Sequence, residues 1–191
     1  MRNKLALAAF AALLPALACA ADTAPHEYLD PDTAATVIVV ARPLTFANAR
    51  TELAANARDY VTLAAAAVDR SGKLSFVAIA YFWSTVDPRM RAAPLRAPQQ
   101  LILMADDRRI QLALRGHSAH DAGIGIAVDP PPGPAVSPSV YGIDLETLRF
   151  MAAARRLTLL AEADGVLLSY RLWDDQRAAL RALVSRMDGG G

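Results

Sequence analysis

Residues 59–86 hold the feature that most constrains the fold, a pair of apolar runs joined by a turn. The runs "DYVTLAAAAVD" (59–69) and "KLSFVAIAYFWSTV" (73–86) flank Arg-Ser-Gly, where Gly72 can adopt the positive φ that a tight hairpin turn needs. Successive side chains of a strand point to opposite faces. In the second run both faces are apolar, with Leu74, Phe76, Ala78, Ala80 and Phe82 on one and Val77, Ile79, Tyr81 and Trp83 on the other. This pattern predicts a central strand that is covered on both sides.

Further hairpins and two helices complete the predicted fold. Two more pairs of apolar runs, over 100–115 and 156–173, surround short polar turns, and "AATVIVVA" (34–41) is β-branched and apolar as in a buried strand. Apolar residues at helical spacing predict helices over 145–155 and 175–187. We therefore expect an α+β fold of mainly antiparallel β structure, sandwich-like and built from successive hairpins, with two helices near the C-terminus.

Neighbouring carboxylates in these segments are explained by turns and helix caps. Asp144 precedes the first predicted helix and Asp174 the second. We interpret both as N-caps, because an Asp side chain can accept a hydrogen bond from the first backbone N–H groups of a helix. Asp106 and Asp107 fall in the turn of the hairpin over 100–115. We assign none of these carboxylates to catalysis.

The first twenty residues have the three parts of an export signal. Arg2 and Lys4 supply a positive start, an apolar run extends from Leu5 to Leu14, and Pro15 is followed by small residues that suit a cleavage site. The apolar run is too short for the roughly 20 residues that a helix needs to span a bilayer. The sequence therefore predicts an exported protein that resides in the periplasm.

Cys19, the only cysteine, has two possible fates. Ala18 and Ala20 occupy the small positions that the general signal peptidase reads, which gives a mature start at Ala21 and discards the thiol. The segment over 16–19 is also similar to a bacterial lipobox, which makes Cys19 the diacylated first residue and anchors the protein to the membrane. We expect the general cleavage, because Leu17 stands where a lipobox has a small residue. Under either cut the folded domain has no disulfide and no free thiol.

Length and charge limit the domain count and the partners. We expect a signal over 1–20, a flexible lead-in over 21–33, a single β-rich domain over 34–188 and a glycine tail over 189–191. Two of the 20 Lys and Arg residues lie in the signal, and the remaining 18 face 19 acidic residues. A balance so close to neutral excludes a nucleic-acid binder or a domain held to a membrane by charge, so contact with a membrane requires lipidation at Cys19.

The segment "HSAHD" (117–121) holds the only clustered histidines. Two imidazoles three residues apart, beside a carboxylate, can reach one metal ion if the loop turns helically, so His117, His120 and Asp121 are the candidate metal ligands. A catalytic zinc site normally has three protein ligands and an open position. The competing interpretation is a solvated loop between a strand and a proline-rich segment. Elsewhere the chain has no G-x-S-x-G nucleophile motif, and the glycines of "AGIGIA" (122–127) lack the strand-turn-helix context of a phosphate site.

Aromatic residues offer a second candidate site. The run Tyr81-Phe82-Trp83 suits a ligand site or an interface, yet aromatics are equally common in a central strand. Because apolar alternation continues upstream on both faces, we interpret the run as core. Trp173, between a strand and a helix, is likewise interpreted as a packing anchor.

Several segments together resemble a known group of proteins. These segments are "VDRSGK" (68–73), "YFWST" (81–85), "DLETLRFMAAARRLTL" (144–159) and "VLLSYRLWDDQRAALRAL" (166–183). They are similar to a family of small exported proteobacterial proteins of uncharacterised function, many of them described as lipoproteins. The resemblance covers most of the mature chain and implies a β-rich envelope protein. It supplies no catalytic residue.

These observations lead to a prediction of function with one alternative. We expect an exported, non-enzymatic protein without a cofactor that binds or supports another envelope protein or ligand. The alternative is a metal-dependent hydrolase that uses the cluster at 117–121.

Overall fold

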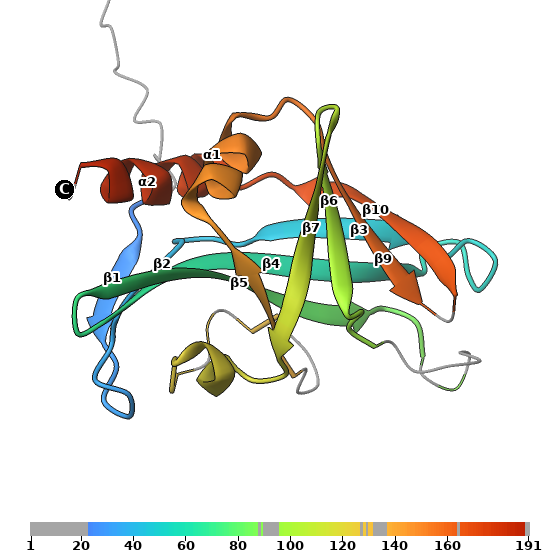
Figure 1. Cartoon of the computed structure of the whole chain (residues 1–191). Helices are drawn as coiled ribbons and strands as arrows, with labels where there is room; N and C mark the ends of the chain where they lie inside the picture. The colour runs from blue at the N-terminus through green and yellow to red at the C-terminus, as the bar shows by residue number, and fades with distance from the viewer. Residues whose placement is uncertain are drawn as a thin grey trace, which may run out of the picture.

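The structure is a computed structural model that describes residues 23–87, 89, 96–126, 128, 130–131, 137–163 and 165–189. This part of the chain forms strands and two α-helices, one of them at the C-terminal end (Figure 1). The strands are β1 (His26–Leu29), β2 (Thr36–Val39), β3 (Leu44–Ala49), β4 (Arg58–Arg70), β5 (Lys73–Ser84), β6 (Gln100–Ala105), β7 (Arg108–Gly116), β8 (Ser139–Ile143), β9 (Leu157–Ala163) and β10 (Val166–Asp174). The helices are α1 (Leu145–Ala153), α2 (Arg177–Asp188) and the short 3-10 helix η2 (Ala119–Ala122).

All of these strands belong to one antiparallel sheet that closes on itself. From β4 the order runs β3, β10, β9, β6, β7, β8 and β5, and β5 pairs with β4 again. The result is a closed, barrel-like sheet of eight strands, to which β2 and β1 add an extension beyond β4. The predicted α+β fold of mainly antiparallel hairpins with two helices is confirmed. The closed sheet is compatible with the sandwich-like arrangement that was predicted.

The β4–β5 hairpin has the tight turn with Gly72 at positive φ that its sequence predicts, and Arg70, placed in the turn by the sequence pattern, belongs to β4. Its register runs from Arg70 opposite Lys73 to Asp59 opposite Ser84. Ser71 and Gly72 both have positive φ, 54° and 78°, which matches the right-handed twist of the flanking strands. Ile79 is 0% exposed, and residues 77–82 of β5 are buried on both faces. The prediction of a central, doubly covered strand is confirmed.

One face of the closed sheet lines its interior, and side chains fill that interior. Residues directly opposite one another in paired strands share a face, so the registers can be followed around the sheet. The inward set includes the buried side chains of Phe46, Leu63, Leu101, Leu103, Leu112, Tyr141, Leu159 and Tyr170. The hydroxyl of Tyr141 donates to the carbonyl oxygen of Pro98 at 2.8 Å, and burial raises the pKa of this phenol above its ordinary value.

The two helices pack against each other and against the sheet on one side (Figure 1). Leu148 and Met151 of α1 and Leu180 and Leu183 of α2 are buried in the core. Asp144 caps α1 as predicted, with its carboxylate accepting a 2.7 Å hydrogen bond from the backbone N–H of Thr147.

The predicted cap of α2 is wrong by two positions. Gln176 is the N-cap residue, and its side chain makes no capping hydrogen bond. The Asp174 carboxylate accepts from the amide of Gln176. Asp175 accepts from the backbone N–H of Arg177 and also pairs with the Arg177 guanidinium. Strand β10 continues through Asp174, so the helix begins too late for Asp174 to cap it.

A long connection covers part of the outer face of the sheet. The segment that includes η2 buries Ala119, Ile124 and Val128, and the hydroxyl of Tyr81 donates to the carbonyl oxygen of Val128 at 2.6 Å. In Figure 1 this segment lies on the opposite side of the sheet from α1 and α2. It explains why the outward side chains of β4 and β5 are buried as well as the inward ones.

Over the described residues 23–33, the structure differs from the flexible lead-in predicted for 21–33. Strand β1 pairs with β2 along its whole length, and in the turn that follows, the Asp30 carboxylate accepts a hydrogen bond from the backbone N–H of Gly125 in the long connection. The polar composition and two prolines of this segment indicate a tether. However, its backbone pairs with β2 and Asp30 binds Gly125, and the local sequence pattern does not reveal these distant contacts.

Candidate functional site

The histidines at 117–121 lie at the end of β7 and in η2, where the aspartate has a structural role. His117 and His120 are exposed. The Asp121 carboxylate accepts hydrogen bonds from the backbone N–H groups of His117 at 2.8 Å and Ser118 at 3.0 Å, while the Ser118 hydroxyl accepts from the Asp121 N–H. This is a capping box. The Ser118 side chain, followed by the two backbone N–H groups, lowers the pKa of Asp121.

This arrangement gives the predicted metal site no support. Among the residues that the structure describes, no three His, Cys, Asp or Glu side chains come together as a group that could hold a metal ion. The Asp121 carboxylate faces its own backbone, and Gly116 is packed so closely that a Cβ there would lie 2.3 Å from the Asp121 Cβ. Cys19, the candidate lipidation site, lies outside the described residues.

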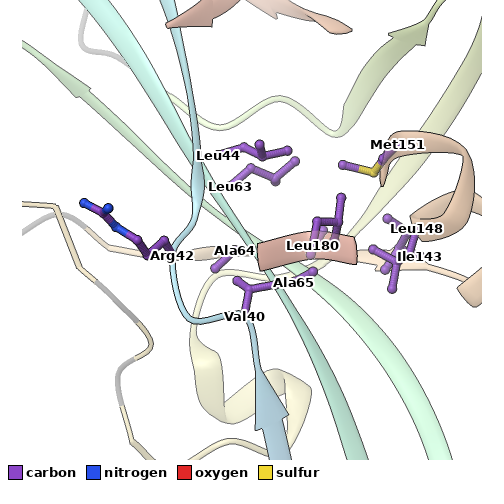
Figure 2. A pocket seen from close by; sticks show the side chains of 11 residues that line it. Val40, Arg42, Leu44, Leu63, Ala64, Ala65, Ile143, Leu148, Met151 and Leu180 are labelled. Atoms are coloured by element: carbon purple, nitrogen blue, oxygen red, sulfur yellow. The ribbon is translucent and has the colours of Figure 1, made fainter. Parts of the chain in front are cut away.

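The interior of the sheet offers very little space for a ligand. A small cavity of ≈ 10 Å³ lies where inward side chains of the sheet meet the helices. Figure 2 shows Leu44 and Leu63 on one side of it and Leu148, Met151 and Leu180 on the other, with the Arg42 guanidinium directed away. This volume is about that of a single water position. An apolar cavity of this size is a packing defect and not a ligand pocket.

The outer face of β3, β9 and β10 is different, because no described element covers it. Burial alternates along β9 and β10, as expected for a sheet with one solvated face. Two open grooves lie here. One, of ≈ 410 Å³, is lined by Ala97, Pro98, Gln99, Gln100, Ile102, Glu162 and Leu167.

The larger groove, of ≈ 560 Å³, lies between β3 and β10, and we call it the β3–β10 groove. It is lined by Ala47, Asn48, Ala49, Arg58, Ser169, Arg171, Leu172 and Trp173. The ladder between these strands pairs Arg171 with Ala47 and shifts register between Leu172 and Asp174. Beyond Ala47 the strands are joined by the Asn48 amide, which donates to the carbonyl oxygen of Ser169 at 2.7 Å. A side-chain bridge thus replaces regular pairing at the groove.

An aromatic cluster adjoins this groove through Trp173, which is one of the lining residues. The rings of Tyr60 and Trp83 stack with centroids 4.2 Å apart, and Trp173 meets Tyr60 edge-on at 6.3 Å. The Trp83 indole N–H donates to the Thr62 hydroxyl at 3.0 Å. The Arg58 guanidinium lies 4.8 Å from the centre of the Trp173 ring, within the range of a cation–π contact.

The aromatic predictions are partly corrected by these contacts. Tyr81 and Phe82 are core residues as expected, but Trp83 is only partly buried and Trp173 is 58% exposed. Trp173 therefore contributes to a surface, where a packing anchor was expected. Sequence reasoning missed the groove because its residues come from β3, β4 and β10, which the pairing of distant strands brings together.

Comparison with known proteins finds no relative: no protein-family model, no curated protein and no solved structure matches the chain. Within the part of the chain that the structure describes, none of the helices has both the length and the apolar character needed to cross a membrane.

Proposed function

We propose that this chain is an exported, non-enzymatic protein of the cell envelope that binds or supports another envelope component through its outer surface. The observation that carries the proposal is the contrast between the two faces of the sheet. Among the residues that the structure describes, buried side chains fill the interior around a cavity of only ≈ 10 Å³, whereas the outer wall has an open groove of ≈ 560 Å³ beside an exposed tryptophan. Ligand pockets for small molecules are typically several hundred Å³ and concave.

The uncovered half of the outer wall supports this proposal further. Leu167 and Trp173 of β10 both face outward and are more than half exposed. Exposed apolar and aromatic side chains on one wall are typical of interaction surfaces. The opposite half of the wall is occupied by the connection that includes η2.

The test of binding is capture from envelope extracts. The exported protein carries a C-terminal affinity tag and is cross-linked in intact cells before purification. We expect a specific envelope component in excess over a control with an unrelated tagged periplasmic protein. A chain that stays in the cytoplasm, or that captures nothing above this control, would contradict the proposal.

The location proposed is the periplasm, with a mature start at Ala21. The residues concerned lie outside the described part of the chain, so the support is the apolar run and the small residues at the predicted cut. Cells labelled with a palmitate analogue are fractionated and the mature mass is determined. We expect a soluble, unlabelled protein that begins at Ala21. Membrane-associated label that disappears in Cys19→Ser would show a lipid anchor, because two acyl chains suffice for stable attachment.

A further inference from the structure

We propose that the β3–β10 groove binds an acidic, extended segment of a partner protein, whose carboxylates are received by Arg58 and Arg171 and whose apolar side chain packs on Trp173. This inference rests on the proposed binding function and names the site and the chemistry of the partner. It is carried by the layout of the groove, by its unmatched charge and by the way in which Arg58 is held.

The strand registers explain why a groove exists at this place. On the outer face, Ala49 of β3 lies opposite Arg58 of β4, and Ala47 lies opposite both Tyr60 of β4 and Arg171 of β10. The two alanines form a low floor between longer side chains on the neighbouring strands. Strands in a sheet are about 4.8 Å apart, and Ala49 and Ala47 are two residues apart along β3 at about 3.4 Å per residue, so the backbones of Arg58 and Arg171 stand about 12 Å apart across this floor. Two guanidinium groups can therefore reach the same bound segment.

The positive charge of the groove is not balanced within its lining, whose described residues include no Asp or Glu. Among the residues that the structure describes, neither Arg58 nor Arg171 forms an ion pair, whereas Arg149, Arg177 and Arg186 each pair with a carboxylate. The planar guanidinium group of arginine matches a carboxylate with two parallel hydrogen bonds. The charge of the groove is thus complementary to an acidic ligand.

Arg58 is held in position before any ligand arrives. Its backbone N–H donates to the Thr85 hydroxyl at 3.0 Å, and its carbonyl oxygen accepts from the Ser84 hydroxyl at 3.1 Å. The guanidinium lies over Trp173. A cation fixed in this way loses little freedom when it binds, so less of the interaction energy is lost to ordering.

The same contact favours a peptide over a glycan. A sugar ring binds an indole by stacking on its face, but Arg58 lies over one face of Trp173 and the Tyr60 ring meets the indole edge-on. An apolar side chain can instead pack along the exposed part of the indole. An extended segment suits the groove, because it can present side chains to Arg58 and Arg171 on both sides of the alanine floor.

The test uses a fluorescein-labelled heptapeptide in which two glutamates flank a leucine, and a matched peptide with glutamines in their place. Binding to the exported protein is followed by anisotropy and by tryptophan fluorescence. We expect saturable binding of the glutamate peptide with a change in tryptophan emission, and at least tenfold weaker binding of the glutamine peptide. Each of the substitutions Arg58→Gln and Arg171→Gln should weaken binding of the glutamate peptide at least tenfold.

The matched control is Lys73→Gln, which removes one exposed positive charge at the opposite end of the β4–β5 hairpin. It should leave binding unchanged. The inference would be overturned if both peptides bound equally well, or if no saturable binding were found. It would also be overturned if Lys73→Gln weakened binding of the glutamate peptide as much as the two arginine substitutions do. So would binding of an anionic oligosaccharide that depends on the two arginines while the peptide fails to bind.

Failure of this site and failure of the proposed function are distinguishable. If the doubly substituted protein (Arg58→Gln with Arg171→Gln) still captures the envelope component, the binding function stands and the groove is excluded. If nothing is captured but the peptide binds through both arginines, the groove stands and the envelope role is excluded.

Discussion

The carboxylate of Asp30 accepts a hydrogen bond from the backbone N–H of Gly125 at 2.7 Å, although the two residues are 95 positions apart. Asp30 is 0% exposed, and its other oxygen accepts from the backbone N–H groups of Asp32 and Thr33, each at 3.0 Å. The Thr33 hydroxyl in turn donates to the carbonyl oxygen of Gly123 at 2.8 Å. The turn after β1 is thereby fastened to the connection that covers the outer face of β4 and β5.

The first prediction is that this contact makes stability depend on pH. Burial by itself would raise the pKa of Asp30, but the backbone hydrogen bonds from Gly125, Thr33 and Asp32 hold the pKa below its ordinary 3.8. A lowered pKa in the folded state means that the carboxylate stabilises the fold fully above the unfolded-state pKa. This contribution is lost as the pH falls through the folded-state value.

The measurement compares urea unfolding of the natural protein and Asp30→Asn from neutral pH downward. We expect the variant to be clearly less stable at neutral pH, and the difference to shrink as the pH falls below 3.8. Asp32→Asn, at an exposed position of the same turn, is the control and should change little at neutral pH. A difference that is independent of pH would contradict the assigned role of the Asp30 charge.

The second prediction concerns the other side of this contact. In Gly125→Ala the added Cβ would lie 2.6 Å from Asp32 Oδ2 and 2.9 Å from Asp30 Oδ1. Either the turn or the connection must then move, and we expect a loss of about 1–3 kcal/mol, as for overpacking in a core. Gly189→Ala, where the closest atom is the Ser185 carbonyl oxygen at 3.4 Å, should cost far less. Equal thermal stability of the two variants would show that the contact is loose.

The third prediction tests the covering of the central strand. Ile79 is fully buried, and an unpaired charge there costs several kcal/mol against a total stability of about 5–15 kcal/mol. We expect Ile79→Asp to be largely unfolded by circular dichroism. Leu74→Asp, on the same strand but 50% exposed, should remain folded with a similar melting temperature. A folded Ile79→Asp protein would mean that the connection with η2 does not seal this face.

The fourth prediction addresses the histidines. Because the Asp121 carboxylate is engaged by the backbone of 117–118, we expect the purified mature protein to contain no stoichiometric zinc, as measured by elemental analysis. The melting temperature should not rise when zinc is added. Stoichiometric zinc that is lost in both His117→Ala and His120→Ala would instead support the metal-dependent hydrolase. Asp121→Ala is expected to destabilise the protein without any change in metal content.

Sequence reasoning predicted the hairpins well because their signals are local. Gly72 in a tight turn and an apolar, doubly covered strand around Ile79 depend only on neighbours in the chain and on the period of two. The Asp144 cap is equally local. The prediction that Asp174 caps α2 was wrong because the boundary between β10 and α2 depends on how far β10 stays paired in the sheet. The helical pattern of the sequence holds no information about that pairing.

The sequence by itself therefore determined the β-rich class, the hairpins and the two helices. The tertiary structure alone decided that the sheet closes, that Asp30 reaches Gly125, and that Arg58 and Tyr60 both meet Trp173 beside β3. Closure depends on pairings such as β3 with β10 and β5 with β8, which join segments far apart in the chain. The alternation of apolar and polar residues along a strand specifies which side chains share a face. It does not specify the neighbouring strand in the sheet, because any strand with a matching apolar face can pair with it. The choice of partner comes from the packing of the whole interior, and that choice leaves one half of the outer wall uncovered.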